Sequence, residues 1–300
     1  MNKPRVSVVI PTCNAQEFLR PALDSVFSQA GPSYEVIVVD DASTDRTRAI
    51  LREYGNRIAV VERTVNSGTA DIPRYDGVEK AKGDFCAFLD ADDLWLPGKL
   101  GKQVAFMDAH PEIPLCHSYV MVMNEQGEDL HLRHQNAIPP TGIIIKDLLR
   151  HCFIATSTVM VRREAWLAAQ RREDVTGYGT EWDFFLAIAR KHPIGFIPEV
   201  LAKYRHVSDS VSRRKWKRTP RDIGAKERIL KKRLWEGVVL RSEMDQIISD
   251  ASLEGSQYWR DRGYAGRAAW FALKAIQHGP LRGGAWVALA KAVGKRLIGD

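Results

Sequence analysis

The first ninety residues alternate between short apolar runs and segments of helical spacing, and this alternation limits the possible folds more than any other feature. The apolar runs predict strands over residues 6–10, 34–40, 58–62 and 84–90. Helices are expected between them: one from Asn14, capped together with Glu17, one from Ser43 to Tyr54, and one over residues 74–82. Alternating strands and helices form a parallel sheet with right-handed crossovers, so the predicted class is α/β with helices on both faces of the sheet.

The remaining chain divides into a mixed region and a helical region. Helices are expected over residues 97–109 and 182–190, and strands over 115–123, 157–161 and 194–198. A basic linker covers residues 213–221. Beyond it the chain is rich in Ala, Leu, Lys and Arg, which predicts helices with a break at Gly279 and Pro280.

Polar clusters follow three of the predicted strands, at residues 11–14, 40–45 and 90–93. Ligands of open α/β sheets bind beyond the carboxyl ends of the parallel strands, so a functional site is expected where these clusters meet.

The cluster after the fourth strand is acidic, with Asp90, Asp92 and Asp93 around Ala91. Neighbouring carboxylates raise each other's pKa unless a cation or a hydrogen-bond donor compensates them. Mg²⁺ or Mn²⁺ is a suitable partner because it prefers carboxylate oxygens and shares itself with substrate phosphates. The cluster is equally compatible with a solvated acidic loop or with charges at a helix N-terminus.

The segment over residues 64–78 joins the third strand to the next helix. It contains the turn residues Asn66 and Gly68, and Arg74, which suits either a phosphate contact or an ion pair with Asp71 or Asp76.

Glu181 and Asp183 begin an aromatic-rich helix. A carboxylate there is compatible with a general base and also with simple complementation of the helix N-terminus.

Five motifs, in this order and spacing, resemble those of family 2 glycosyltransferases with the GT-A fold. They are SVVIPTCNA, VDDASTD, the segment from Asn66 to Arg74, FLDADDLWLPGKL, and the set E-W-D with Y-R-H-x-S-x-S. The resemblance covers about residues 4–212. It implies a GT-A catalytic domain over residues 1–212, a Rossmann-like, mainly parallel sheet flanked by helices, with a basic helical extension over residues 213–300.

The resemblance implies nucleotide-sugar binding at ten positions: Pro11, Thr12, Asn14, Asp41, Ser43, Asn66, Gly68, Arg74, Asp90 and Ala91. Asp41 matches the aspartate that hydrogen-bonds the nucleobase. Cys13 stands where the family often has an aromatic residue. Asp90 and Asp92 match the ends of the DxD motif, with Asp92 expected to ligate Mg²⁺ or Mn²⁺ directly.

Two further implied roles concern the later motifs. Glu181 falls where the family usually has its catalytic aspartate, with Asp183 as the second candidate. His206 is displaced by one residue from the family's pattern and is compatible with a metal or phosphate contact or with an ordinary surface position.

The implied reaction moves a sugar, with inversion, from a nucleoside diphosphate sugar to an acceptor hydroxyl in glycan or polysaccharide synthesis. UDP is the favoured nucleotide, and the acceptor is a glycan or a lipid-linked glycan. The alternative is a non-catalytic sugar-nucleotide-binding or assembly subunit on the same fold. A nucleotidyltransferase and a Rossmann oxidoreductase are excluded because no Gly-rich loop follows the first strand.

The charge is divided unevenly between the two regions. Residues 1–212 contain 24 Lys/Arg and 28 Asp/Glu, whereas residues 213–300 contain 20 and 9, a net charge of +11. The basic runs at residues 213–218 and 231–233 fit a solvated face or peripheral contact with an anionic membrane. A nucleic-acid partner is not expected, because no motif for one accompanies the charge.

The expected location is the cytoplasm, with possible peripheral association at the inner face of the membrane. No apolar run approaches the length of a membrane span, and the N-terminus does not resemble a signal peptide. Cys13, Cys86, Cys116 and Cys152 lie far apart in the sequence and are expected to be reduced thiols rather than zinc ligands.

Overall fold

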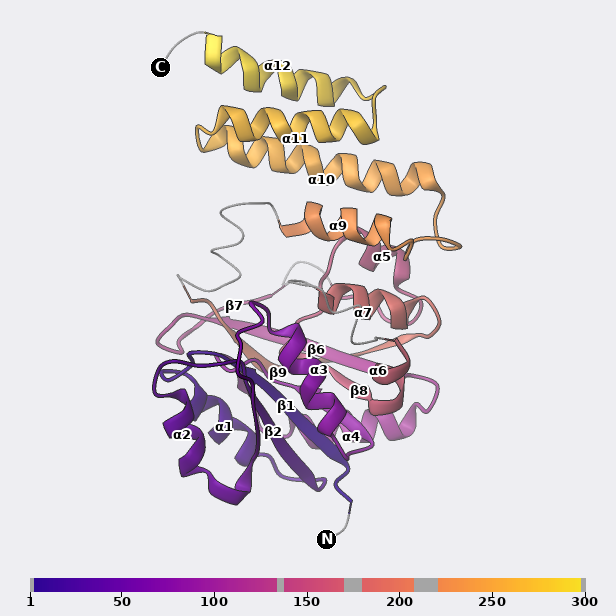
Figure 1. Cartoon of the computed structure of the whole chain (residues 1–300). Helices are drawn as coiled ribbons and strands as arrows, with labels where there is room; N and C mark the ends of the chain where they lie inside the picture. Colours follow the sequence, from indigo (N-terminus) through magenta and orange to yellow (C-terminus); the bar gives the residue numbers. More distant parts are fainter. Residues whose placement is uncertain (1–2, 134–137, 170–179, 208–220, 298–300) are drawn as a thin grey trace. The chain divides into compact units, whose positions relative to one another are not determined.

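The computed structural model describes residues 3–133, 138–169, 180–207 and 221–297 (Figure 1). The chain forms two compact units. Unit 1 comprises Met1–Ile145 and Cys152–Ser208, and unit 2 comprises Lys146–His151 and Asp209–Asp300. The expected boundary between residues 212 and 213 lies outside the described residues, as do residues 213–220 of the expected linker. The last linker residue, Arg221, is instead the first residue of a helix.

Unit 1 is built on one sheet, which has nine strands among the described residues. The strands are β1 (Val6–Thr12), β2 (Tyr34–Asp40), β3 (Ala59–Glu62), β4 (Phe85–Phe88), β5 (Leu94–Trp95), β6 (Leu115–Met123), β7 (Asp129–Leu132), β8 (Met160–Arg162) and β9 (Ile194–Arg205). Their order is β3-β2-β1-β4-β8-β6-β9-β5, and β7 pairs with β6. The pairs among β1 to β4 are parallel, as predicted, whereas β8 joins β4 in the antiparallel sense.

The helices of unit 1 follow the strands in chain order. They are α1 (Leu19–Phe27), α2 (Thr47–Glu53), α3 (Asp71–Lys80), α4 (Lys99–Ala109), α6 (Arg163–Ala169) and α7 (Thr180–Ala189), with short 3₁₀ turns at Gly55–Arg57 and Thr156–Thr158. The α/β class with a mainly parallel, helix-flanked sheet is therefore confirmed.

Strand β1 is buried along its whole length because helices cover both faces of the sheet. Val8 and Ile10 share one core with Leu19 and Leu23 of α1. The alternate residue Val9 meets α3, where a Cβ on Gly77 would lie 2.4 Å from a methyl carbon of Val9. Only glycine at that position lets α3 approach the sheet this closely.

The start predicted for the first helix is wrong. Helix α1 begins at Leu19 without a side-chain cap, and Asn14 adopts a left-handed conformation with φ of 49°. Its side-chain oxygen accepts a hydrogen bond from the amide of Thr44 at 2.8 Å, so the predicted cap side chain serves a neighbouring loop instead.

The predicted cap of the second helix is also wrong. Ser43 accepts a hydrogen bond from the amide of Asn14 at 2.9 Å, and α2 begins only at Thr47. The amide of Thr47 donates instead to Oδ1 of Asp45, at 2.9 Å.

The later elements differ from prediction mainly at their ends. Strand β6 matches, the strand expected over 157–161 is a 3₁₀ turn followed by β8, and β9 extends from Ile194 to Arg205 rather than ending at residue 198. Strands β5 and β7 and helix α6 were not predicted.

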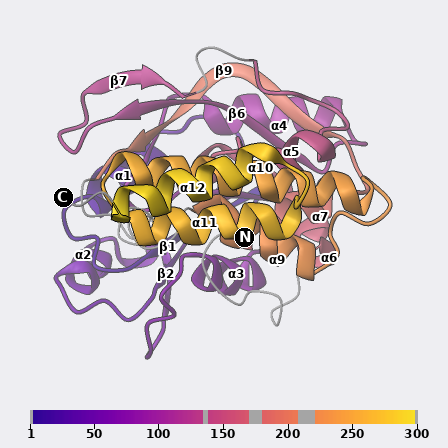
Figure 2. The same cartoon turned by 90° about the horizontal axis from the view of Figure 1, so that it is seen from above.

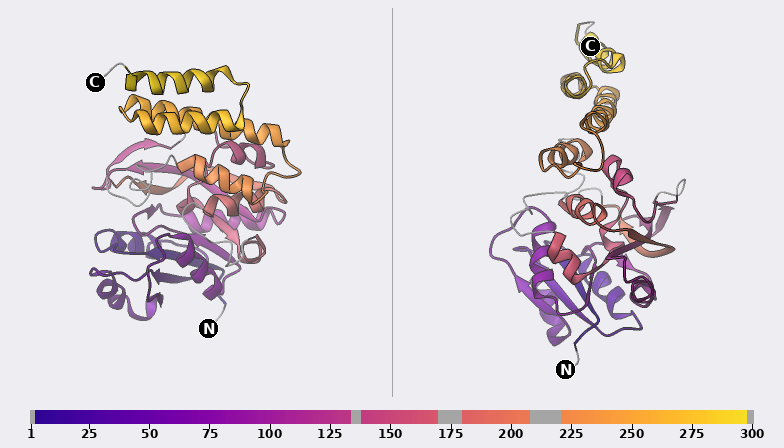
Figure 3. Two further views of the ribbon diagram at one scale, coloured as in Figure 1. Left: turned by 45° about the horizontal axis from the view of Figure 1, so that its top comes forward. Right: turned by 90° about the vertical axis from the view of Figure 1, so that its right-hand side faces the viewer.

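Unit 2 is helical. Its elements are α5 (Ile145–Arg150, whose first residue belongs to unit 1), α9 (Arg221–Lys231), α10 (Arg241–Asp261), α11 (Ala265–His278) and α12 (Gly283–Leu297). Helices α10, α11 and α12 lie beside one another (Figures 2 and 3). Their shared core contains Trp259, Phe271 and small alanines. The predicted break at residues 279–280 is confirmed, since α11 ends just before it. Among the described residues, every helix is too short or too polar to span a bilayer.

Candidate functional site

Three polar clusters lie at one edge of the sheet because the strands that carry them are parallel. Strand β1 ends at Thr12, which is in register with Asp40 at the end of β2. Strand β4 runs beside β1 in the same direction and leads into the acidic turn at residues 90–93. The arrangement matches the ligand-binding edge of open α/β sheets.

The loops after β1 and β2 are joined by side-chain hydrogen bonds. Besides the contacts of Asn14 with Ser43 and Thr44, the amide of Ala15 donates to Oγ1 of Thr47 at 2.8 Å. Both loops are thereby fixed in position before any ligand binds.

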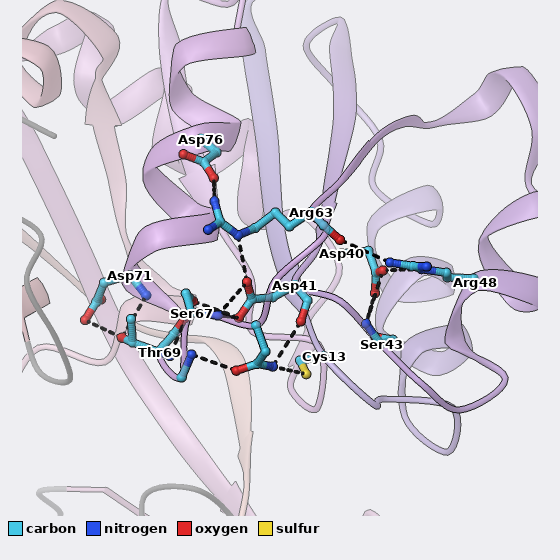
Figure 4. Close-up of polar contacts among 12 residues, drawn as sticks. Cys13, Asp40, Asp41, Ser43, Arg48, Arg63, Ser67, Thr69, Asp71 and Asp76 are labelled. Carbon is cyan, nitrogen blue, oxygen red and sulfur yellow. Dashed lines mark hydrogen bonds and ion pairs between the residues drawn. The ribbon is translucent and has the colours of Figure 1, made fainter.

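Asp40 and Asp41 are almost fully buried, and each meets an arginine (Figure 4). Nε of Arg48 donates to Asp40 at 2.7 Å, and Nε of Arg63 donates to Oδ1 of Asp41 at 2.7 Å. Asp41 also accepts hydrogen bonds from the amide and the hydroxyl of Ser67, at 2.9 and 2.7 Å. These donors hold the Asp41 carboxylate in one orientation.

Arg63 also forms an ion pair with Asp76 of α3 (Figure 4). The guanidinium therefore links the end of β2 to the helix that carries Arg74.

Asn66 lies next to Asp41 and contacts Cys13. Its Nδ2 donates to the backbone oxygen of Asp41 at 3.0 Å and to the sulfur of Cys13 at 2.9 Å, and its Oδ1 accepts from the amide of Gly68. Gly68 has a φ of 71°, which favours glycine in this turn. Burial and the charges of Asp41 and Asp40 raise the pKa of the Cys13 thiol.

Arg74 connects this loop to the acidic turn. Its Nη1 donates to Asp71 at 2.7 Å and its Nη2 to Oδ1 of Asp90 at 2.8 Å. Asp71 is one of the two carboxylates expected to pair with it. Burial lowers the pKa of Arg74, but the charges of Asp90, Asp71 and Glu181 outweigh burial and raise that pKa. Glu181 therefore lies within electrostatic reach of this arginine.

The acidic turn is closed by a hydrogen bond from the amide of Asp93 to the oxygen of Asp90. Burial, and then the charge of Asp90, raise the pKa of Asp92 to about 6. Burial and the charges of Asp92 and Asp90 also raise the pKa of Asp93 well above its usual range.

Asp93 is anchored by two other elements. It accepts hydrogen bonds from the hydroxyl of Ser157 at 2.5 Å and from the amide of Arg205 at 2.8 Å. The Arg205 side chain donates to the backbone oxygen of Asp92 at 2.8 Å, so β9 holds the turn in place.

The remaining candidates surround these groups. Pro11 and Ala91 are buried, and Pro11 lies two residues after Val9, the last β1 residue paired with β4. Asp183 is buried on α7, while His206 is exposed and its amide donates to the oxygen of Met123 at 2.8 Å. Within the described part of the chain, nothing hydrogen-bonds the buried hydroxyl of Thr12. A buried hydroxyl left in this state is costly, which favours a ligand at this edge.

The acidic turn fits a hard divalent cation. No group of three or more His, Cys, Asp or Glu side chains is placed to hold an ion within the described residues. Mg²⁺, however, is usually held by one or two carboxylates together with substrate phosphates. Asp90 and Asp92 can supply those carboxylates. Their negative charges repel each other, and a bound cation would neutralise them.

Sequence reasoning assigned no role to several residues that organise the site, namely Arg63, Ser67, Ser157 and Arg205, and placed Asp93 only within the acidic cluster. Arg63 directly follows β3, and its position at a strand end was an available signal. Ser157 lies in a 3₁₀ turn and Arg205 in β9, both far from the acidic turn along the chain, so no local sequence pattern indicates their contacts with it.

Comparison with known proteins places the chain in a family. The family model described as "Glycosyl transferase family 2" matches residues 7–169. The putative teichuronic acid biosynthesis glycosyltransferase TuaG of Bacillus subtilis is 35% identical over 224 residues, which cover 72% of this chain and 84% of that protein.

Two solved structures share the fold. The crystal structure of S. aureus TarS 1-349 in complex with UDP-GlcNAc has a TM-score of 0.64 at 18% identity and covers 97% of this chain and 88% of its own. The mannosyltransferase PcManGT from Pyrobaculum calidifontis, in complex with GDP-Man and Mn²⁺, has a TM-score of 0.56 at 20% identity, covering 99% and 88%. With the family model matching more than half of its residues, the chain belongs to glycosyltransferase family 2.

Proposed function

We propose that this glycosyltransferase moves a sugar from a nucleoside diphosphate sugar, with UDP-sugar favoured, to an acceptor hydroxyl in the synthesis of a cell-surface glycan. The name of the TuaG relative and the UDP-GlcNAc bound to TarS support this choice of donor and pathway class. The observation that carries the proposal is the chain of contacts from Asp41, through the Arg63 bridge and α3, to Arg74 and the acidic turn.

The residues at the ends of β1 and β2 would bind the nucleoside. Asp41 is a buried carboxylate held by Arg63 and Ser67, and a carboxylate accepts a hydrogen bond from a nucleobase N–H. Thr12, Pro11 and Asn14 border the same position at the end of β1. Ser43, Asn66 and Gly68 complete the loops around it.

The residues of the acidic turn would bind the diphosphate. Asp90 and Asp92 would hold Mg²⁺ or Mn²⁺, with Ala91 between them and His206 as a further candidate ligand. When bound, such an ion stabilises the negative charge that develops on the leaving diphosphate. Arg74 fixes Asp90 through the hydrogen bond at 2.8 Å and adds positive charge beside the phosphates.

Glu181 is the proposed general base. It would take the proton from the acceptor hydroxyl as that oxygen bonds to the anomeric carbon and the bond from that carbon to the diphosphate breaks. Attack from the face opposite the leaving group inverts the configuration. Asp183 is the second candidate for this role.

The proposed division of labour assigns the transfer to residues 1–212 and membrane contact to the basic extension, residues 213–300. The acceptor would be a glycan or a lipid-linked glycan. A cytoplasmic location with peripheral association at the inner face of the membrane remains a prediction.

Calorimetric titration with UDP, GDP, dTDP and CDP, each with and without Mn²⁺, tests the donor site. We expect one nucleotide, UDP first, to bind in a metal-dependent manner and to lose that dependence in Asp92→Ala. The matched control is Asp129→Ala, an exposed carboxylate on β7, which should bind as the native chain does.

Two results would contradict the proposal. Metal-independent binding that Asp92→Ala does not change would remove the acidic turn from the donor site. Tight nucleotide binding without hydrolysis or transfer of the matching sugar nucleotide would favour the non-catalytic alternative.

A further inference from the structure

The outer helices of unit 2 expose large apolar side chains. We define the α11–α12 face as Trp270, Leu273, Leu281, Trp286, Val287 and Val293, all of which are solvent-exposed. Leu281 lies in the turn between the two helices and is 98% exposed. Helices α11 and α12 pack side by side, as the view from above shows (Figure 2).

The distribution of side-chain size in α12 is the reverse of that in an ordinary surface helix. The buried side of α12 consists of Ala285, Ala288 and Ala292, while its tryptophan and valines face outward. Surface helices normally bury their large apolar residues and expose polar ones. The core of unit 2 is complete without the α11–α12 face, which is therefore suited to an apolar environment outside the chain.

The same segment is strongly basic. Residues 262–297 contain seven Lys/Arg and no Asp or Glu. Two of these charges are paired, Lys274 with Glu227 and Arg282 with Asp250, whereas Lys291 is exposed on α12. The positive charge that remains favours an anionic partner over a second copy of the same surface.

The tryptophans have the character of side chains at a lipid interface. Nε1 of Trp286 donates to the backbone oxygen of Pro280 at 2.8 Å, which satisfies its polar atom and leaves the ring as an apolar surface. Helices that lie in the plane of a membrane interface combine exposed Trp and Leu with Lys and Arg. Such helices lie on the bilayer without spanning it, in keeping with the length and polarity of α11 and α12.

We propose that the α11–α12 face binds the surface of an anionic lipid bilayer. Leu281, Trp286 and Val287 enter the interface, and the basic residues of the segment meet the lipid headgroups. This attachment specifies the membrane contact proposed above for residues 213–300 and rests on that part of the proposed function. It needs no nucleotide, so its failure and the failure of the donor site are distinguishable.

Sedimentation of the full chain with vesicles tests the proposal. Vesicles of phosphatidylcholine with phosphatidylglycerol should bind the chain, less strongly at high salt, and vesicles of phosphatidylcholine alone should not. The double variant Leu281→Ser, Val287→Ser should bind the anionic vesicles about tenfold more weakly, because two apolar side chains leave the interface. Since Leu281 is exposed, an unchanged melting temperature and nucleotide affinity should show that the variant is folded.

The matched control is Ile143→Ser, which removes an apolar side chain that is 74% exposed in unit 1 and should leave vesicle binding unchanged. Equal binding to neutral and anionic vesicles would overturn the proposal, as would no binding to either. Light scattering that shows a dimer dissociated by the double variant, with no vesicle binding, would identify the face as a protein interface and also overturn it.

Discussion

The two sides of the candidate site balance their charges differently. On the β2 side, Asp40 and Asp41 each meet an arginine, Arg48 and Arg63. On the β4 side, Arg74 pairs with Asp90, whereas burial and mutual repulsion raise the pKa values of Asp92 and Asp93. The first side is electrically complete and suits a neutral group such as a nucleobase. The second side keeps an excess of negative charge beside Arg74 and Arg205 and suits a cation that arrives with the phosphates.

The largest effect is expected on the β4 side, where the charge of Glu181 helps to raise the pKa of Arg74. Glu181→Gln should reduce the rate of sugar transfer by about 10²–10⁴-fold, because an amide cannot accept the acceptor's proton. Nucleotide affinity measured by calorimetry should stay close to native. Asp183→Asn is the companion variant. Full activity in Glu181→Gln together with loss of activity in Asp183→Asn would identify Asp183, and not Glu181, as the general base.

The pH dependence of metal-assisted binding should come next in size. Below pH 6 Asp92 holds a proton that it must release to ligate a cation, since its pKa is raised to about 6. The Mn²⁺-dependent affinity for UDP should therefore fall by up to about tenfold for each pH unit below 6 and level off above 7. Titrations at several pH values measure it. A flat profile from pH 5 to 7 would show that Asp92 does not ligate the metal.

On the β2 side, removal of one arginine should break the charge balance of Asp41. Arg63→Met should weaken UDP binding about tenfold with and without Mn²⁺, because the buried carboxylate loses its cationic partner and its fixed orientation. Arg63→Lys should recover part of the affinity. The matched control is Arg20→Met, which breaks an exposed ion pair with Glu53. A loss of UDP affinity seen only in the presence of Mn²⁺ would contradict the prediction, because it would show that the β2 and β4 sides do not act separately.

A separate effect, on stability rather than on binding or activity, concerns a buried lysine away from both sides. Lys99 donates to Gln103 and lies 4.2 Å from the centroid of the Trp95 ring, and burial lowers its pKa to about 7. Between pH 7 and 10 the unfolded chain holds the proton that the folded chain has released. The free energy of unfolding should therefore rise with pH by about 1.4 kcal/mol per unit from this group.

Lys99→Met removes that dependence, so its free energy of unfolding, measured relative to that of the native chain, should fall as pH rises from 7 to 10. Urea denaturation at several pH values measures the change. The control Lys102→Met, at an exposed ion pair with Glu199, should run parallel to the native chain. Parallel curves for Lys99→Met as well would mean that Lys99 keeps its proton when folded.

The part of the site that follows from topology could be predicted from the sequence. Asp41 and Asp90 had to meet at one edge because parallel strands end together, and the pairing of Arg74 with Asp71 was one of two local alternatives.

The parts that depend on distant contacts could not be predicted. Asn14 satisfied a local capping pattern, yet its side chain binds Thr44, thirty residues away. Arg63 reaches Asp41 only because β3 lies beside β2. The two-residue strand β5 has no pattern of its own and forms only by pairing with β9.

The anchoring of Asp93 by β9 determines the shortest fragment of this chain in which the donor site can keep its structure. The amide of Arg205 and the hydroxyl of Ser157 hold the acidic turn from 112 and 64 residues further along. A fragment ending with the family match at residue 169 would keep Asp90 and Asp92 but would lose the hydrogen bond from Arg205 to Asp93, one of the two that hold their turn. Any truncation meant to preserve the donor site must therefore extend past Arg205.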